Sequence, residues 1–161
     1  MRLFNKIFAI IILILFLFSC ANRSQKTNTD IPFNKQGTVT IKNYLNQDII
    51  FDVELAEDDW SRMQGLMFRY KLEDNQGMFF IMPTETYQSF WMRNTYLSLD
   101  MIFIDENMEI VEIYENAFPL SDDFIQSSYP AKYVLEVLAG MSLKNSIRVG
   151  DFVRFERFFI E

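Results

Sequence analysis

Residues Phe90 to Asp105, F-W-M-R-N-T-Y-L-S-L-D-M-I-F-I-D, carry the strongest strand signal of the chain. Leu97 to Ile104 predicts a strand, and its unbroken apolar part, Met101 to Ile104, is typical of a strand that is covered on both faces. Asp100 lies within this predicted strand, between Leu99 and Met101. Because an isolated buried charge is very costly, the carboxyl group of Asp100 must be paired, hydrogen-bonded or protonated.

Alternating apolar and polar residues on either side of this stretch predict further strands. The expected strands span residues 38–41, 49–55, 78–82, 90–93, 109–114, 132–139 and 152–160. Glu57 to Gly65 predicts a short helix, since acidic residues suit a first helical turn and glycine suits a helix end. Pro83 is expected to end the strand before it. These elements predict an all-β, mainly antiparallel fold, a compact β-barrel or sandwich with one or two short helices.

The composition excludes several classes of function. The chain has 161 residues, with 15 Lys and Arg against 22 Asp and Glu, which argues against a nucleic-acid partner. It contains no His, so the usual near-neutral general base and the commonest metal ligand are both missing. We therefore expect no metal site and no cofactor. Any catalysis would have to use carboxylates, Tyr, Ser or Lys, and no catalytic motif is recognisable.

The N-terminus predicts a lipoprotein signal peptide over residues 1–19. Arg2 and Lys6 flank the start of an apolar run of twelve residues, Ile7 to Phe18. As a helix this run would cover roughly 18 Å, which is too short for a hydrocarbon core of about 30 Å. The segment that follows, Leu17-Phe18-Ser19-Cys20, resembles the lipobox of bacterial lipoproteins. Cys20 is the only cysteine in the chain, and we expect it to be lipidated.

Three regions are therefore expected along the chain. Residues 1–19 form the signal peptide, residues 20–36 form the lipid-anchored cysteine with a polar tether, and residues 37–161 form a single β domain. This arrangement predicts a cell-envelope protein that is bound to the membrane through Cys20. Ala21 differs from the Asp that resembles an inner-membrane retention signal, which favours the outer membrane, facing the periplasm, over the inner membrane.

Short motifs follow one another along the domain: G-L-M-F-R (65–69), G-M-F-F (77–80), F-W-M-R-N-T (90–95), L-D (99–100), I-F-I-D (102–105), Y-V-L-E (133–136), A-G (139–140) and G-D (150–151). In this order they resemble the bacterial and archaeal family known as domain of unknown function 192. Arg93 stands where the family usually has Lys, which changes the hydrogen-bond geometry, and Ser98 stands where Pro is typical. The resemblance implies a compact β-barrel-like domain and brings no established activity.

Six residues are candidates for a ligand site: Arg69, Trp91, Arg93, Asn94, Asp100 and Glu136. Asp100 and Glu136 each lie in a predicted strand among apolar residues, with Arg69, Arg93 and Asn94 as possible partners. One hypothesis is a structural ion-pair network that fixes the strand register. The other is a cleft in which Arg69 or Arg93 binds an anionic or hydroxylated ligand, Asn94 orients it and Trp91 offers a stacking face, unless Trp91 only fills the core.

Three functions stay open on the sequence alone. The expected one is a non-catalytic envelope lipoprotein whose β domain binds a small ligand, a glycan or a protein partner. The first alternative is a hydrolase of envelope glycan that uses Asp100 and Glu136 as acid and base, which requires the two carboxyls ~5 to ~9.5 Å apart across an open cleft. The second alternative is a structural or assembly module.

Overall fold

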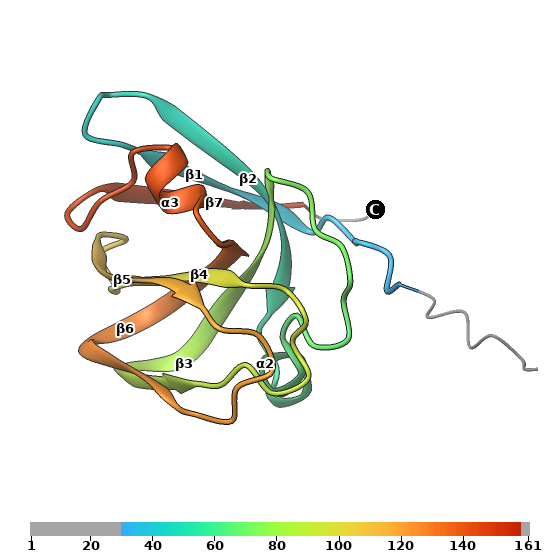
Figure 1. Ribbon diagram of the computed structural model, residues 1–161. Coiled ribbons are helices and arrows are strands. Elements are labelled where there is room, and N and C mark those ends of the chain that lie inside the picture. The colour runs from blue at the N-terminus through green and yellow to red at the C-terminus, as the bar shows by residue number, and fades with distance from the viewer. Residues whose placement is uncertain (1–29, 159–161) are drawn as a thin grey trace, which may run out of the picture.

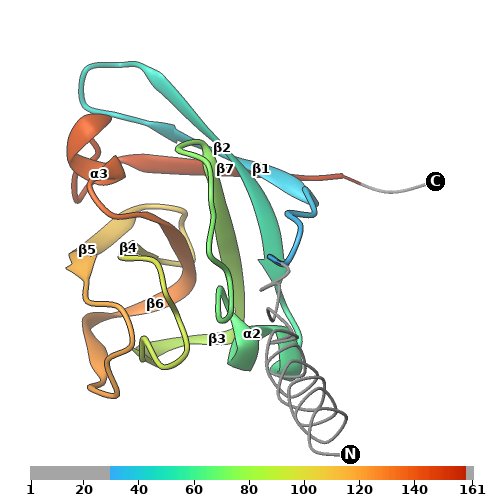
Figure 2. The same cartoon turned by 45° about the vertical axis from the view of Figure 1, so that its right-hand side comes forward.

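The computed structural model describes residues 30–158 (Figures 1 and 2), and Cys20, the signal peptide and residues 20–29 of the tether lie outside them. The described part contains seven strands and two short helices: β1 (Gly37–Lys42), β2 (Asp48–Ala56), α2 (Asp59–Gln64), β3 (Gln76–Phe90), β4 (Leu99–Ile104), β5 (Ile110–Ala117), β6 (Ile125–Leu138), α3 (Met141–Lys144) and β7 (Phe152–Arg157). The predicted all-β class is confirmed. No helix within residues 30–158 is long and apolar enough to cross a membrane.

The seven strands form one curled sheet in the order β5-β4-β6-β3-β2-β1-β7. All neighbouring pairs are antiparallel except β2 and β3, which run parallel and are connected through α2. The two ends of the sheet meet where Glu109 forms a bridge with Phe152. Two backbone bonds support this contact, from Val153 N to Met108 O (2.8 Å) and from Ile110 N to Asp151 O (2.9 Å). The sheet therefore closes on itself at this point.

Strands β3 and β6 form a long bent ribbon, seen at the bottom of Figure 1. The prediction that Pro83 ends the strand is wrong, because β3 continues through it. The pairing with β6 breaks after Ile81 and resumes at Thr86, so the proline, which lacks an N–H, occupies an irregularity of the ladder. The bend brings the Phe90 ring back against the Phe80 ring, with the two centroids 5.1 Å apart.

Two other boundaries differ from the prediction. The expected strand over residues 90–93 is wrong, because β3 ends at Phe90 and the chain turns, with Thr95 N donating to Met92 O (3.0 Å) and Asn94 at a φ of 56°. The strand that was expected over residues 132–139 begins earlier than predicted, because β6 already starts at Ile125. The alternation of apolar residues is weak in both segments, so their structure depends on contacts with distant strands.

The strands bury apolar residues on both faces of the sheet. The inner core, inside the curl, includes Ile41, Val53, Phe79, Ile102, Leu135 and Val153. The outer core, between the sheet and its loops, includes Leu66, Phe80, Met101, Phe103, Ile125 and Val134. Every residue of β4 is buried, as its apolar run predicted. Successive residues, such as Phe79 and Phe80, therefore belong to different cores.

Candidate functional site

A pocket of about 350 Å³ lies on the outer face of the sheet, inside the bend of β3. Its walls are mostly apolar and come from the segment after α2, from both halves of β3 and from the loop before β6; they include Leu66, Met82, Phe80, Phe90, Trp91 and Phe124. Among the polar residues that line it are Arg62, Gln88 and Glu136. A small ligand would therefore meet a mainly apolar surface with a few fixed polar groups.

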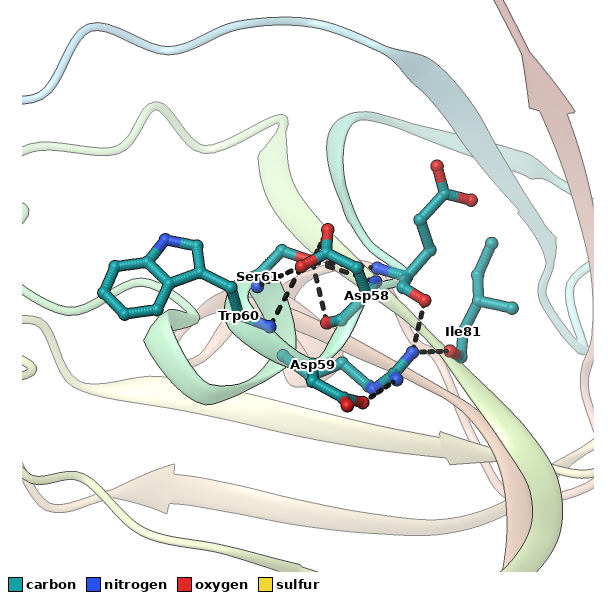
Figure 3. Close-up of polar contacts among 7 residues, drawn as sticks. Asp58, Asp59, Trp60, Ser61 and Ile81 are labelled. Carbon is teal, nitrogen blue, oxygen red and sulfur yellow. Dashed lines mark hydrogen bonds and ion pairs between the residues drawn. The ribbon is translucent and has the colours of Figure 1, made fainter.

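Helix α2 forms one wall, and its own hydrogen bonds hold it in place (Figure 3). Asp58 caps the helix by accepting from Trp60 N (2.9 Å) and Ser61 N (3.0 Å). Arg62 donates to the Ile81 carbonyl of β3 (3.1 Å), to the Glu57 carbonyl and to Asp59 (2.7 Å). The Arg62 guanidinium therefore forms its hydrogen bonds within the protein and connects α2 to the bend of β3.

Glu136 is the buried acid of the pocket. Its side chain projects from β6 on the outer face, between Met78 of β3 and Met101 of β4. The residue is 5% exposed, and its carboxyl has no hydrogen-bond partner within residues 30–158. Burial raises the pKa of this carboxyl to about 8. At neutral pH the group is mainly protonated, so it can donate a hydrogen bond to a ligand and also accept one.

Gly65 keeps the space in front of Glu136 open. A Cβ atom at this position would lie 3.9 Å from Glu136 Oε2 and 3.3 Å from the Phe80 ring, and the residue has a φ of 50°. A side chain here would fill part of the pocket and would also strain the backbone. The glycine that ends α2 thus leaves room beside the acid.

Asp100 is fully buried and is held by backbone groups. Its carboxylate accepts hydrogen bonds from Asn116 N (3.0 Å), Gly140 N (3.1 Å) and Ser142 N (3.0 Å). The sequence predicted that this carboxyl is paired, hydrogen-bonded or protonated, but the possible partners Arg69, Arg93 and Asn94 are wrong. Asp100 joins β4 to the end of β5 and to the start of α3, so its role is structural.

Asp100 and Glu136 lie on opposite faces of the sheet. The register places Asp100 beside Val137, in the inner core, whereas Glu136 stands beside Met101, in the outer core. Residues that face each other across two strands share a face, and consecutive residues do not. The hydrolase alternative required both carboxyls in one open cleft. That prediction is wrong, because the two acids lie on opposite faces of the sheet.

Arg69 is also buried, at 4% exposure, and forms an ion pair with Glu54 of β2. Glu54 further accepts from Asn34 N (2.5 Å). Glu54 was not among the candidates, because it alternates with Val53 and Asp52 as an ordinary exposed strand position does. This pair attaches the segment after α2 to the sheet, and Arg69 is outside the pocket lining.

The remaining candidates lie at or beyond the edge of the pocket. Arg93 is exposed, binds Asp122 (2.6 Å) and places its guanidinium 4.4 Å from the centre of the Trp91 ring. Asn94 is exposed, and its backbone carbonyl accepts from Phe68 N (2.9 Å). Trp91 lines the pocket and stacks on Phe124, with centroids 5.8 Å apart. Of the six candidates, the structure thus brings only Trp91 and Glu136 together in the pocket.

Comparison with known proteins agrees with the motifs and with the fold. The model of an uncharacterised conserved family, DUF192, matches residues 40–155, which include all of the pocket lining. The chain belongs to the DUF192 family. A curated relative, the UPF0127 protein PF1050 of Pyrococcus furiosus, is 27% identical over 113 residues, covering 69% of this chain and 92% of the relative.

Two solved structures resemble this DUF192 domain. One, from Sinorhizobium meliloti, is described as a candidate transcription regulator; it has a TM-score of 0.73 and 36% identity, and the match covers 78% of this chain and 97% of that one. The other, a protein of unknown function from Novosphingobium aromaticivorans, has a TM-score of 0.70 and 33% identity, with 73% and 83% covered. These similarities establish the DUF192 fold for this chain and assign no activity to its pocket.

Glu136→Gln is expected to change how the stability of the DUF192 domain depends on pH. The carboxyl titrates near 4.5 when it is unfolded and near 8 when it is folded, so the folded state alone keeps the proton between these values. The wild type therefore loses stability as pH rises through this window, by up to about 1.4 kcal/mol per pH unit, and Gln does not. Urea unfolding at pH 5 and pH 7 should show the variant gaining roughly 2.5 kcal/mol relative to the wild type between these two pH values.

Burial, and not a neighbouring charge, causes the raised pKa of the Glu136 carboxyl. Arg62 on α2 lines the pocket but is bound to the Ile81 and Glu57 carbonyls, and Glu54 on β2 lies beyond Met78 of β3. Parallel pH profiles for the wild type and the Gln variant would show that the carboxyl is ionised in the folded protein.

Proposed function

We propose that this protein is a non-catalytic lipoprotein of the cell envelope whose DUF192 domain binds a small, uncharged and mostly apolar ligand in the pocket beside Glu136. The observation that carries this proposal is the Glu136 carboxyl, which is buried, lines an apolar pocket and has no hydrogen-bond partner among the described residues. The Glu136 oxygens are not fully sealed, so a ligand in the pocket can replace water there and hydrogen-bond to them among apolar walls.

The charges of the pocket support an uncharged ligand. Glu136 is mainly protonated at neutral pH, and the Arg62 guanidinium already binds Asp59 and two backbone carbonyls. A charged ligand would thus lose its hydration without gaining an opposite charge inside the pocket. A glycan is less well suited than an apolar ligand, because its many hydroxyls would meet Phe80, Phe90 and Leu66.

The Sinorhizobium meliloti protein is described as a candidate regulator of transcription. The net charge of −7 of the present chain opposes contact with a phosphate backbone and so argues against such a role. The proposed ligand binding is based only on the pocket beside Glu136.

Binding of acetophenone, a small uncharged aromatic ketone, tests the proposal. In the full chain, held in a lipid nanodisc, acetophenone should shift the ¹H–¹⁵N NMR signals of residues around the pocket, such as Gly65 and Phe90. Ser89→Trp places a large side chain at the exposed rim of the pocket and should weaken binding at least tenfold. Thr84→Trp is the matched control, since Thr84 is exposed on the same strand and lies outside the lining. Equal loss in both variants, or no shifts at the pocket, would contradict the proposal.

The membrane anchor is tested at Cys20, the only cysteine in the chain. We propose that acylation of this residue holds the protein at the outer membrane, facing the periplasm. Because several acyl chains bind a membrane much more firmly than one does, the wild type should sediment with membranes after cell fractionation. Cys20→Ala should move most of the protein to the soluble fraction or leave an uncleaved precursor of higher mass. A variant that is processed normally and stays in the membrane fraction would refute lipidation.

A further inference from the structure

A second polar side chain faces the same pocket in a fixed orientation. Gln88 is buried, and its Nε2 donates to the carbonyls of Thr86 (3.1 Å) and Ala131 (2.8 Å), while its backbone N donates to Ser127 Oγ (2.8 Å). Turning the amide over would place its oxygen against two carbonyl oxygens, so the hydrogen bonds decide its orientation. Gln88 Oε1 is then an acceptor without a partner among residues 30–158, on a residue that lines the pocket.

Gln88 and Glu136 therefore offer complementary hydrogen-bonding groups. Oε1 of Gln88 can only accept, so it needs a ligand N–H or O–H. The Glu136 carboxyl in its neutral form can donate to a ligand carbonyl. Both residues are more than nine-tenths buried, but their unpaired oxygens are not fully sealed and stay within reach of a ligand in the pocket. A ligand that satisfies both must carry an acceptor and a donor on one apolar body.

We infer that the ligand class of this pocket is an uncharged amide-type molecule, such as an aromatic amide, lactam or pyrimidinone, whose carbonyl accepts from Glu136 and whose N–H donates to Gln88. This inference rests on the proposed function and specifies it further. The apolar body of such a ligand lies against Phe80, Phe90 and Leu66. Its polar edge forms one hydrogen bond with Gln88 Oε1 and one with the Glu136 carboxyl, which have no such partner among the described residues.

Four benzene derivatives of nearly the same size test this chemistry at pH 7. Benzamide carries both a carbonyl and an N–H, acetophenone carries the carbonyl alone, benzoate is an anion and benzamidine is a cation. Benzamide should bind the full chain in nanodiscs about tenfold more tightly than acetophenone, because one additional buried hydrogen bond is satisfied. Benzoate and benzamidine should both bind more weakly than benzamide. Dissociation constants come from the NMR shifts of Gly65 and Phe90.

Variants connect the preference to the two side chains. Gln88→Leu should remove the advantage of benzamide over acetophenone, and Glu136→Leu should weaken both. Glu136→Gln, which still donates and accepts, is the matched control and should keep the advantage. Since Gln88→Leu also removes two hydrogen bonds of the protein, N,N-dimethylbenzamide provides the same test on the wild type. It has no N–H and should lose the advantage of benzamide.

The outcomes separate this inference from the proposed function. Acetophenone binding with no advantage for benzamide would overturn the amide class and leave the pocket as a binding site. Tighter binding of benzamidine than of benzamide would also overturn it, because the acid would then hold a cation. If none of the four compounds shifts the pocket signals, the proposed function itself fails.

Discussion

Asp100→Asn is expected to lower the free energy of unfolding by about 2–4 kcal/mol, one of the two largest effects that the structure predicts. The wild-type carboxylate accepts hydrogen bonds from the backbone N–H groups of Asn116, Gly140 and Ser142. An asparagine has one acceptor oxygen, and its NH₂ group would point at a backbone donor. At least one buried N–H would therefore lose its partner. Urea unfolding measured at constant pH gives the change directly.

Asp122→Asn is the matched control for this experiment, because the Asp122 side chain is 71% exposed. Its effect should stay within about 0.5 kcal/mol. In Asp100→Asn, amide hydrogen exchange should also speed up at Gly140 and Ser142, which lose their acceptor. If Asp100→Asn left the free energy of unfolding unchanged but abolished ligand binding, the structural role would be contradicted. Asp100 would then be a ligand-binding residue.

Glu54→Gln is expected to cost about 3–5 kcal/mol, because it leaves the charge of Arg69 buried without a counter-ion. Arg69 has little to replace the lost contact, since its Nε and Nη1 atoms have no partner among the described residues even in the wild type. The double variant Glu54→Leu with Arg69→Met removes both charges and should be much closer to the wild type. Urea unfolding of Glu54→Leu, Arg69→Met and the double variant completes a double-mutant cycle.

The exposed pair of Lys144 and Asp74 serves as the control for the buried pair. Their side chains are 58% and 64% exposed, so Asp74→Asn should change the stability by less than about 0.5 kcal/mol. A similarly small effect of Glu54→Gln would indicate that water reaches Arg69, and the segment after α2 would then be held by its apolar contacts alone.

Much of the strand pattern was predictable from short stretches of sequence. The alternating residues of β1 and β2, the apolar run of β4 and the acidic start of α2 each carry their own signal, and the structure has strands or a helix at these places. The errors lie where the signal depends on a distant partner. Pro83 looked like the end of a strand, because the sequence does not show that β6 breaks its pairing at this proline. Helix α3 is one short turn after Gly140 and has no apolar period to predict it.

The candidate site was less predictable than the strands. Residue type alone identified Asp100 and Glu136 as charges among apolar residues and Arg69 as a possible partner, and all three are buried. It also suggested that they would act together, but each has a different environment. Backbone N–H groups surround Asp100, Glu54 pairs with Arg69, and Glu136 faces the pocket. Gln88 and Glu54 were missed, because a polar residue near apolar ones resembles an ordinary exposed position of a strand.

Local sequence is enough to predict that Phe90 to Asp105 contains a buried strand and that the Asp100 carboxyl within it must be paired, hydrogen-bonded or protonated. Both conclusions depend only on local properties, namely the run of apolar residues and the cost of burying a charge. Which groups contact Asp100 and Glu136 depends on how the strands pair in the folded protein. The pairing of Asp100 with Val137 and of Met101 with Glu136 places one acid inside the curl of the sheet and the other in the pocket. A strand alternates its side chains between two faces, but only its pairing with other strands decides what each face meets.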